Sequence, residues 1–426
     1  MTEPQTGFVR EIGRWTLTAL VINSIIGSGI FGLPSTIAGL LGKMSPYAYL
    51  LAAAGIGIIM ACFAEVASQF RDAGGPYLYA RTAFGRFTGL QMGWLAWLVR
   101  LTAAAANANL FVDYLAEFWP GATGTVVRVV LLTLLLGGLA AINYRGVRVG
   151  AQTSNFFTVA KLLPLTIFIV AGIILLRGNV AAHVITTGTG DWPKALLLLM
   201  FAYGGFEAAL IPLGETKNPR RDAPFALFIA LMTCALFYTL IQGVVVSALA
   251  APEETKRPVA EAARVFMGAG GAGLVTLGAI ISVYGYLSSA MLNAPRLTFA
   301  IAAGKDFPQF FGAIHPRFRT PHVSIVIFAL MLWGVAVAGS FKWNASLSAV
   351  ARLFTYGLVC GALIKLRRQQ PHGEAFRLPF GPAFALVGIL FSLYLISGMG
   401  YGELLAIIAT AVLAFVNWVL VKRKAL

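Results

Sequence analysis

Three glycines near the start of the chain have a spacing that can serve phosphate chemistry. Gly27, Gly29 and Gly32 lie within the stretch IIGSGIFGLP and follow the G-x-G-x-x-G pattern. In a soluble α/β unit, such glycines let bare backbone amides at a helix N-terminus approach a pyrophosphate. This chemistry requires a strand before the glycines and a βαβ unit around them. The elements that surround the stretch therefore decide what its amides can bind.

The composition of the chain argues against a soluble context. Of the 426 residues, 58% are hydrophobic and only 11% are charged, whereas an ordinary globular domain has about 25% charged residues. About twelve apolar stretches, each long enough to cross roughly 30 Å of hydrocarbon as a helix, follow one another with short connections. We therefore expect an all-α polytopic membrane protein, with residues 1–426 forming a single integral membrane domain. The stretches cover approximately residues 15–41, 47–69, 87–115, 125–142, 151–176, 193–213, 224–250, 268–298, 322–339, 345–366, 378–398 and 403–421.

The formal net charge of +16 reports topology rather than a nucleic-acid partner. Most Lys and Arg residues fall in loops on the same side as the N-terminus, and cytoplasmic loops of membrane proteins carry such an excess. This distribution predicts a multi-pass protein of the cytoplasmic (inner) membrane with both termini in the cytoplasm. The basic loops then face the anionic lipids of the inner leaflet.

Cysteines and histidines give no support for a catalytic or metal centre. Cys62, Cys234 and Cys360 lie singly in apolar stretches, which is typical of buried, unpaired thiols. The histidines fall in loops or at the ends of stretches and form no cluster with carboxylates. We therefore expect no metal, no cofactor and no enzymatic activity. A channel is also disfavoured, because the sequence contains no filter loop or charged ring.

Two of the apolar stretches are interrupted at corresponding positions. The first is broken at Gly27-Ser28-Gly29, and the sixth carries MFAYGGFEAALIPLG with Gly204-Gly205 at its centre. A single glycine-rich interruption can equally serve close helix packing. Two interruptions five stretches apart favour a transporter built from inverted repeats. The predicted repeats cover about residues 15–176 and 193–366, and two extra helices follow over about 378–421.

Interrupted helices at membrane depth expose backbone groups that must line a polar cavity or find a ligand. An amino acid is a suitable one, because its carboxylate can accept hydrogen bonds from the amides around Ser28, Gly29 and Ile30 at the positive end of a half-helix. Its ammonium can donate to carbonyl oxygens where the preceding half-helices end. The candidate carbonyls are those of Ile25, Phe201, Ala202 and Gly204.

Four motifs together resemble the amino acid–polyamine–organocation transporters: IIGSGIF, GGPYLYARTAFG at 74–85, TVAKLLPL at 158–165 and FAYGGFEAALIPLGETKNPRRDAP at 201–224. The resemblance covers most of the chain. It implies a LeuT-like 5+5 inverted-repeat fold with discontinuous helices 1 and 6, and alternating access to a central amino acid site. The substrate-binding residues that it implies are Ile25, Ile26, Gly27, Ser28, Gly29, Ile30, Phe201, Ala202, Tyr203, Gly204 and Gly205.

Lys161 lies in the middle of the fifth apolar stretch. A lysine there costs about 2.5 to 3.5 kcal/mol on insertion scales and needs a partner or a function. It can pair helices by donating to carbonyls. The family resemblance implies instead that its ammonium takes the place of a sodium ion and bridges segment 1 carbonyls to the hydroxyls of Ser288 or Ser289. This predicts sodium-independent transport, with Lys161 also a candidate to gain and lose a proton.

Other charged residues within the apolar stretches leave alternatives open. Glu207 follows the second break and can either take up a proton during transport or accept hydrogen bonds from unpaired amides. Glu65, near the inner end of the second stretch, is expected to be a structural partner for basic loop residues. Arg100 and Arg352 can contact the substrate, or pair with Glu207, Asp113 or helix carbonyls.

The expected function is secondary transport of L-amino acids, with neutral substrates favoured and coupling by proton symport or exchange. Three buried cations disfavour a dicationic substrate, although an amino acid/amine antiporter for cationic substrates is the alternative. Phe201 and Phe206 flank the second break and resemble the occluding gate of the family, but they can also be core residues. The partners expected are a small amino acid, protons and the lipid bilayer, and the oligomeric state is left open.

Overall fold

A computed structural model describes residues 13–70, 75–146, 151–176, 188–210, 216, 218–304, 306–369 and 376–423. The elements that they form are α-helices and short 3-10 helices. The α-helices are α1 (Arg14–Ile25), α2 (Gly29–Leu41), α3 (Ser45–Ser68), α4 (Gly75–Phe84), α5 (Arg86–Leu115), α6 (Thr125–Arg145), α7 (Ala151–Leu175), α8 (Trp192–Ala202), α9 (Phe206–Ala209), α10 (Pro219–Ala248), α11 (Pro258–Ala303), α12 (His322–Ala338), α13 (Phe341–Gln369), α14 (Gly381–Ile396) and α15 (Tyr401–Arg423). The 3-10 helices are η1 (Gly42–Met44), η2 (Pro120–Thr123), η5 (Pro252–Glu254) and η6 (Gln309–Gly312).

Each of the twelve predicted apolar stretches contains a helix or a pair of half-helices, which confirms the all-α polytopic fold. Within the described residues, seven helical spans are long and apolar enough to cross a membrane. The first stretch is divided between α1 and α2, and the sixth between α8 and α9. The division into inverted repeats at 15–176 and 193–366 remains a prediction.

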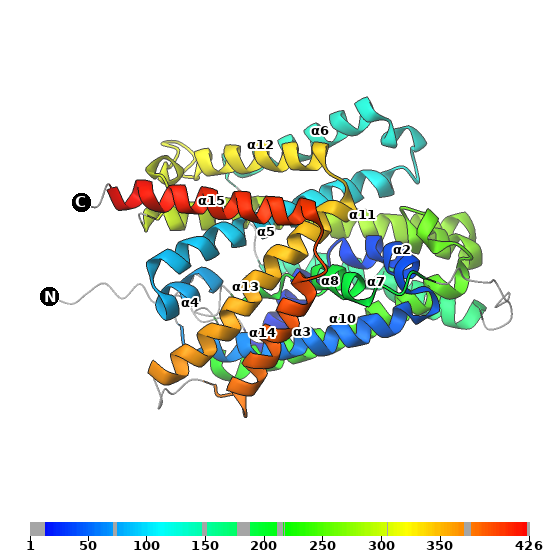
Figure 1. Ribbon diagram of the computed structural model, residues 1–426. Helices are drawn as coiled ribbons and strands as arrows, with labels where there is room; N and C mark the ends of the chain where they lie inside the picture. Colours follow the sequence, from blue (N-terminus) through cyan, green and yellow to red (C-terminus); the bar gives the residue numbers. More distant parts are fainter. Residues whose placement is uncertain are drawn as a thin grey trace.

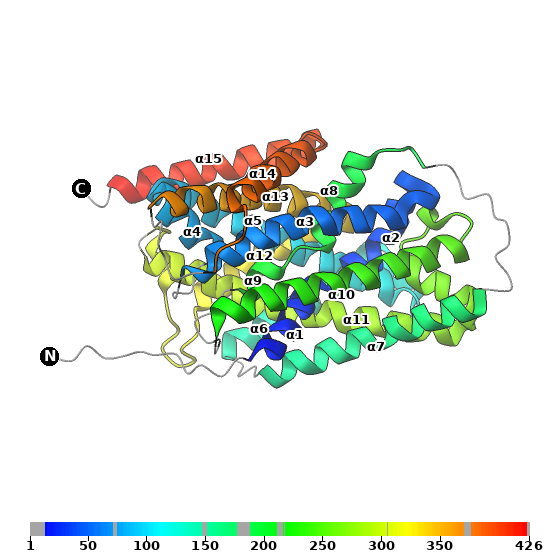
Figure 2. The same ribbon diagram turned by 90° about the horizontal axis from the view of Figure 1, so that it is seen from below.

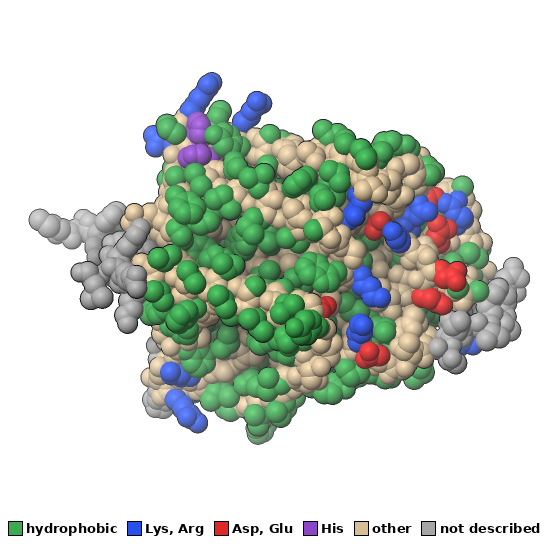
Figure 3. Space-filling model, turned by 45° about the horizontal axis from the view of Figure 1, so that its top comes forward, with side chains coloured by type: hydrophobic (Ala, Val, Ile, Leu, Met, Phe, Trp, Pro, Cys, Tyr) green, Lys and Arg blue, Asp and Glu red, His purple; other side chains and the backbone are tan. Residues whose placement is uncertain are grey.

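Most of the long helices, among them α3, α10, α12 and α15, run roughly along one direction, and α13 and α14 cross it obliquely in the view of Figure 1 (Figures 1 and 2). α5 and α13 pack along each other at the centre, α10 packs on α3, and α11 contacts both α5 and α7. Figure 3 shows hydrophobic side chains over the middle of the visible face, with charged side chains gathered toward its two ends. This pattern suits a bundle with a hydrocarbon-facing middle and two polar ends.

Two local features were not predicted from the apolar pattern. α4 is a ten-residue helix within the motif GGPYLYARTAFG, which is too short and too polar to appear as a span. α11 begins at Pro258, ten residues before its apolar stretch, and bends at Gly268, whose φ of +67° lies in the left-handed region. Both helical segments lie beside longer helices that the pattern did identify, so packing rather than hydrophobic periodicity accounts for them.

Glu65 fastens α3 to α13, as expected for a structural carboxylate. Its two oxygens accept hydrogen bonds from Arg367 Nε at 2.5 Å and Nη2 at 2.6 Å. The Leu378 amide also donates to Glu65, at 2.9 Å, and Arg367 donates to the Leu378 carbonyl at 2.6 Å. This bidentate pair joins α3, α13 and the segment before α14 at one end of the bundle.

Candidate functional site

The two helix breaks lie against each other in the core. α1 ends at Ile25, Ile26 is extended, and α2 begins at Gly29. α8 ends at Ala202, and Gly205 adopts a left-handed conformation with φ of +112° before α9. A Cβ placed on Gly29 would lie only 2.8 Å from the Ala202 Cα, so the absence of a side chain allows this close approach.

Tyr238 of α10 links the two breaks, a role that sequence reasoning missed. Its hydroxyl lies 3.0 Å from the Ala202 carbonyl oxygen and 3.3 Å from that of Ile25. These are two of the carbonyls that we expected to bind a substrate ammonium. In this conformation Tyr238 occupies them. A tyrosine within an apolar run is normally a core residue, and nothing local distinguishes this one.

Lys161 of α7 is 1% exposed and binds the first break. Its ammonium donates to the Ile26 carbonyl at 2.7 Å and to the Asn23 carbonyl at 3.2 Å. Among the described residues, no hydrogen bond joins Lys161 to Ser288 or Ser289. Ser289 instead accepts a hydrogen bond from Asn293, at 3.1 Å. The ammonium therefore satisfies carbonyls that the end of α1 leaves without helical partners.

The amides of the first break are enclosed. Ser28 N donates to Asn107 Oδ1 at 3.2 Å, and the buried Ser28 hydroxyl has no hydrogen-bond partner among the described residues. Gly29 and Ile30 belong to the first turn of α2, where helix geometry provides no acceptor for their amides. Gly27 faces Tyr286 and Asn107. These groups keep the donors of the predicted carboxylate site together, in a closed arrangement.

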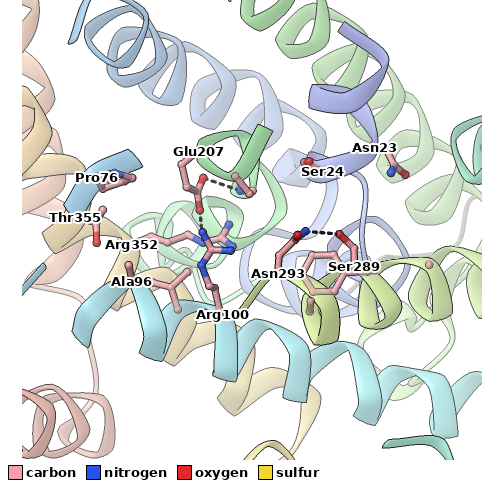
Figure 4. Close-up of a pocket in the computed structure, with 16 residues that line it drawn as sticks. Asn23, Ser24, Pro76, Ala96, Arg100, Glu207, Ser289, Asn293, Arg352 and Thr355 are labelled. Atoms are coloured by element: carbon pink, nitrogen blue, oxygen red, sulfur yellow. Dashed lines mark hydrogen bonds and ion pairs between the residues drawn. The ribbon is translucent and has the colours of Figure 1, made fainter. Parts of the chain in front are cut away.

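A cavity of about 90 Å³ lies next to the breaks. Of the residues predicted for binding or coupling, Gly205, Glu207 and Ser289 line it, whereas residues 25–30 and 201–204 do not. The wall also includes Asn23 and Ser24 from α1 and polar or charged groups from α5, α11 and α13 (Figure 4). These further groups are Arg100, Tyr286, Asn293, Arg352 and Thr355.

Glu207 at the start of α9 is held by three groups. One carboxylate oxygen accepts from the Gly205 amide at 2.9 Å and from the Tyr356 hydroxyl at 3.2 Å. The other lies 3.5 Å from Arg352 Nε in an ion pair. The structure thus contains two of the arrangements left open by the sequence, an amide contact for Glu207 and a carboxylate partner for Arg352.

Gly204 makes room for Arg352. A Cβ on Gly204 would overlap the Arg352 guanidinium, and one on Gly205 would overlap the Ser24 carbonyl. The glycine pair therefore serves packing between the second break, α13 and α1, in addition to any approach of a ligand. The sequence showed both Gly204 and Arg352, but a contact between residues so far apart has no local signal.

The two aromatic gate candidates have different surroundings. Phe201 packs edge-on against Phe341 of α13, with ring centroids 6.1 Å apart. Phe206 is fully buried and packs against Phe63 and Tyr356. Both phenylalanines lie at the second break, and the gate role of each residue remains a prediction.

The described part of the chain contains no group of three or more His, Cys, Asp or Glu residues arranged to hold a metal ion. Cys62, Cys234 and Cys360 are buried free thiols.

The sequence matches the family model described as "Amino acid permease" over residues 12–420. Similar proteins from Bacillus subtilis include a serine/threonine exchanger, which is 28% identical over 92% of this chain and 92% of its own length. A branched-chain amino acid permease is 25% identical over 99% of this chain and 95% of its own length. A methylthioribose transporter is 26% identical over 97% of this chain and 91% of its own length. These matches extend over nearly the whole chain, as the four motifs indicated.

Proposed function

The chain belongs to the amino acid permease family, and we propose that it carries neutral L-amino acids across the cytoplasmic membrane by alternating access. The observation that carries this proposal is the meeting of two helix breaks in the core. Backbone amides are left without helical partners at the first break, between α1 and α2. The second break, between α8 and α9, lies beside it. Amides at a half-helix N-terminus suit a carboxylate, and nearby carbonyls suit an ammonium.

We propose that transport is independent of sodium. The Lys161 ammonium holds two carbonyls of the first break, which are the kind of oxygen ligand that a sodium ion would need. Coupling would then use protons or exchange of one substrate for another. Lys161 and Glu207 are the candidate proton carriers, since both are ionisable groups at the breaks.

The charge of the cavity supports neutral over dicationic substrates. Arg100 and Arg352 both line it, and Glu207 is the one carboxylate among the described residues of its wall. Two of the relatives are named for neutral amino acids, serine and threonine or branched-chain residues. A third is named for methylthioribose, so membership of the family alone does not fix the substrate. We retain the positive-inside orientation, with both termini in the cytoplasm, as part of the proposal.

Uptake by the purified full chain in proteoliposomes tests this function. We expect saturable uptake of L-serine or L-leucine that is stronger than uptake of the D-enantiomer, and acceleration by unlabelled substrate on the opposite side if the protein is an exchanger. Non-saturable flux would indicate a channel, and chemical conversion of the substrate an enzyme. Absence of uptake for all twenty amino acids would overturn the proposal.

A further inference from the structure

We infer that Arg100 and Arg352 form a second carboxylate site, separate from the amides of the first break, in the cavity beside α9. Residues 27–30 do not line this cavity, so a ligand there is not held by the α2 N-terminus. In naming the transported amino acid as the source of the carboxylate, the inference rests on the proposed function. The site would receive the α-carboxylate after it leaves the first break.

The first support is the charge of the wall. Among the residues that the structure describes, the charged side chains that line the cavity are Arg100, Arg352 and Glu207, and their charges sum to one positive charge in excess. An uncompensated charge in a poorly solvated site is costly, and a bound anion removes that cost. A single carboxylate has the required charge.

The second support is the incomplete hydrogen bonding of Arg352. The residue is 3% exposed, and its Nη1 has no hydrogen-bond partner among the described residues. Glu207 approaches only the Nε side, at 3.5 Å. Buried guanidinium N–H groups are normally satisfied, and a planar fork of donors matches a carboxylate. The hydroxyls of Tyr286 and Tyr356 also interact with the Arg352 side chain, so the donor that remains for a ligand is Nη1.

Arg100 provides the second donor group. It makes no hydrogen bond or ion pair within the described part of the chain, and it lines the same cavity from α5. Arg100 interacts electrostatically with both Glu207 and Arg352, and Figure 4 draws the three side chains at the same part of the cavity. Two adjacent like charges repel each other, and the attraction of both to an anion bound between them offsets that repulsion.

The rest of the wall suits the other end of an amino acid. Asn293 donates its amide N–H to Ser289, which leaves its carbonyl oxygen as an acceptor, and the Ser24 hydroxyl lies on the α1 side. A cavity of about 90 Å³ has room for a polar ligand in place of several water molecules. The same charges disfavour lysine, ornithine and other substrates with an additional cation.

The test measures binding of acetate, L-serine and L-leucine to the purified full chain by calorimetry. The Arg100→Gln variant removes one guanidinium without breaking an observed ion pair, and Arg100→Lys restores the charge. Lys342→Gln is the matched control, since it removes an exposed positive charge at the start of α13, the helix that contains Arg352. We expect acetate to compete with the amino acid in the wild type. Arg100→Gln should weaken both by about tenfold or more, Arg100→Lys should recover part of the affinity, and Lys342→Gln should bind as the wild type does.

A second pair of variants does not depend on removing Arg100. Ala96 lines the cavity one helical turn before Arg100, so Ala96→Glu would place a carboxylate on the proposed site, whereas Ala96→Gln adds the same bulk without charge. We expect Ala96→Glu to abolish acetate competition and Ala96→Gln to retain it.

The inference is overturned if Arg100→Gln binds acetate and the amino acids as tightly as the wild type, or if the two Ala96 variants behave alike. Competition by chloride but not by acetate would assign the site to a halide and equally overturn it. Acetate binding that depends on Arg100 in a protein that transports no amino acid would support the carboxylate site and refute the proposed function. Amino acid transport that is unchanged when Arg100 is replaced would support the proposed function and refute the carboxylate site.

Discussion

At the scale of single residues, Lys161 connects the sequence to the mechanism most directly. Its position in an apolar stretch predicted a partner or a function, and the structure places its ammonium on the Asn23 and Ile26 carbonyls. Hydrogen bonds to a charged group contribute about 1.5 to 3 kcal/mol, and buried carbonyls that lose them are costly. Lys161 thus stabilises the first break in the conformation described here.

Lys161→Ala should lower the initial rate of amino acid uptake to about a tenth or less. The reason is that the variant loses about 1.5 kcal/mol or more of stabilisation at the break, which corresponds to roughly a tenfold change in rate. Uptake into proteoliposomes at two pH values checks this. Lys342→Gln, an exposed lysine, is the control for protein handling. Unchanged, pH-dependent uptake by Lys161→Ala would reject the coupling role.

A second residue-scale prediction concerns Gly204. An added methyl group would overlap the Arg352 guanidinium and displace it from Glu207. Gly204→Ala should therefore lower the melting temperature and reduce uptake, because one partner of a buried ion pair is left without compensation. Gly243→Ala is the matched control in an open position of α10. Equal melting temperatures and uptake rates for the two variants would contradict this account.

At the scale of elements, the breaks are held by side chains from other helices. The breaks at Gly27–Gly29 and Gly204-Gly205 could be predicted, because glycines that interrupt an apolar stretch are a local feature of the sequence. Tyr238 carries none, because its role depends on α10 lying beside both breaks. The same reason explains why the sequence identified Arg352 as a buried cation but left its partner open.

Tyr238→Phe tests this link between elements. Without the hydroxyl, the Ala202 and Ile25 carbonyls lose their shared donor, which should cost about 1 to 3 kcal/mol. We expect a lower melting temperature and slower uptake. Tyr394→Phe is the control, because Tyr394 lies on the exposed face of α14. The link has no energetic role if both phenylalanine variants have the same melting temperature as the wild type.

The pair of Glu65 and Arg367 makes a further element-scale prediction. Removing one partner of a buried ion pair costs about 3 to 5 kcal/mol, with a smaller effect where a side chain retains some solvent. Arg367→Gln should strongly destabilise the joint between α3 and α13, since Glu65 is almost fully buried. The double variant Glu65→Gln with Arg367→Gln should recover part of the loss in thermal unfolding. A double variant less stable than Arg367→Gln would show that the uncompensated charge is not the cause.

At the scale of the whole molecule, composition and twelve apolar stretches were sufficient to predict the helical fold. Hydrophobic length determines where a chain can cross a membrane, so the segment positions follow from local sequence. Packing order and the cavity wall do not follow from it. The predicted binding residues 25–30 are enclosed in this conformation, while the cavity draws its charges from α5, α9 and α13.

The most direct test of the central claim is uptake of L-serine and L-leucine into proteoliposomes with sodium chloride or choline chloride on both sides, with and without an inward proton gradient. We expect saturable uptake of at least one of them at the same rate in sodium and in choline, because Lys161 already occupies the carbonyls of the first break. Uptake that occurs only in the presence of sodium would contradict it.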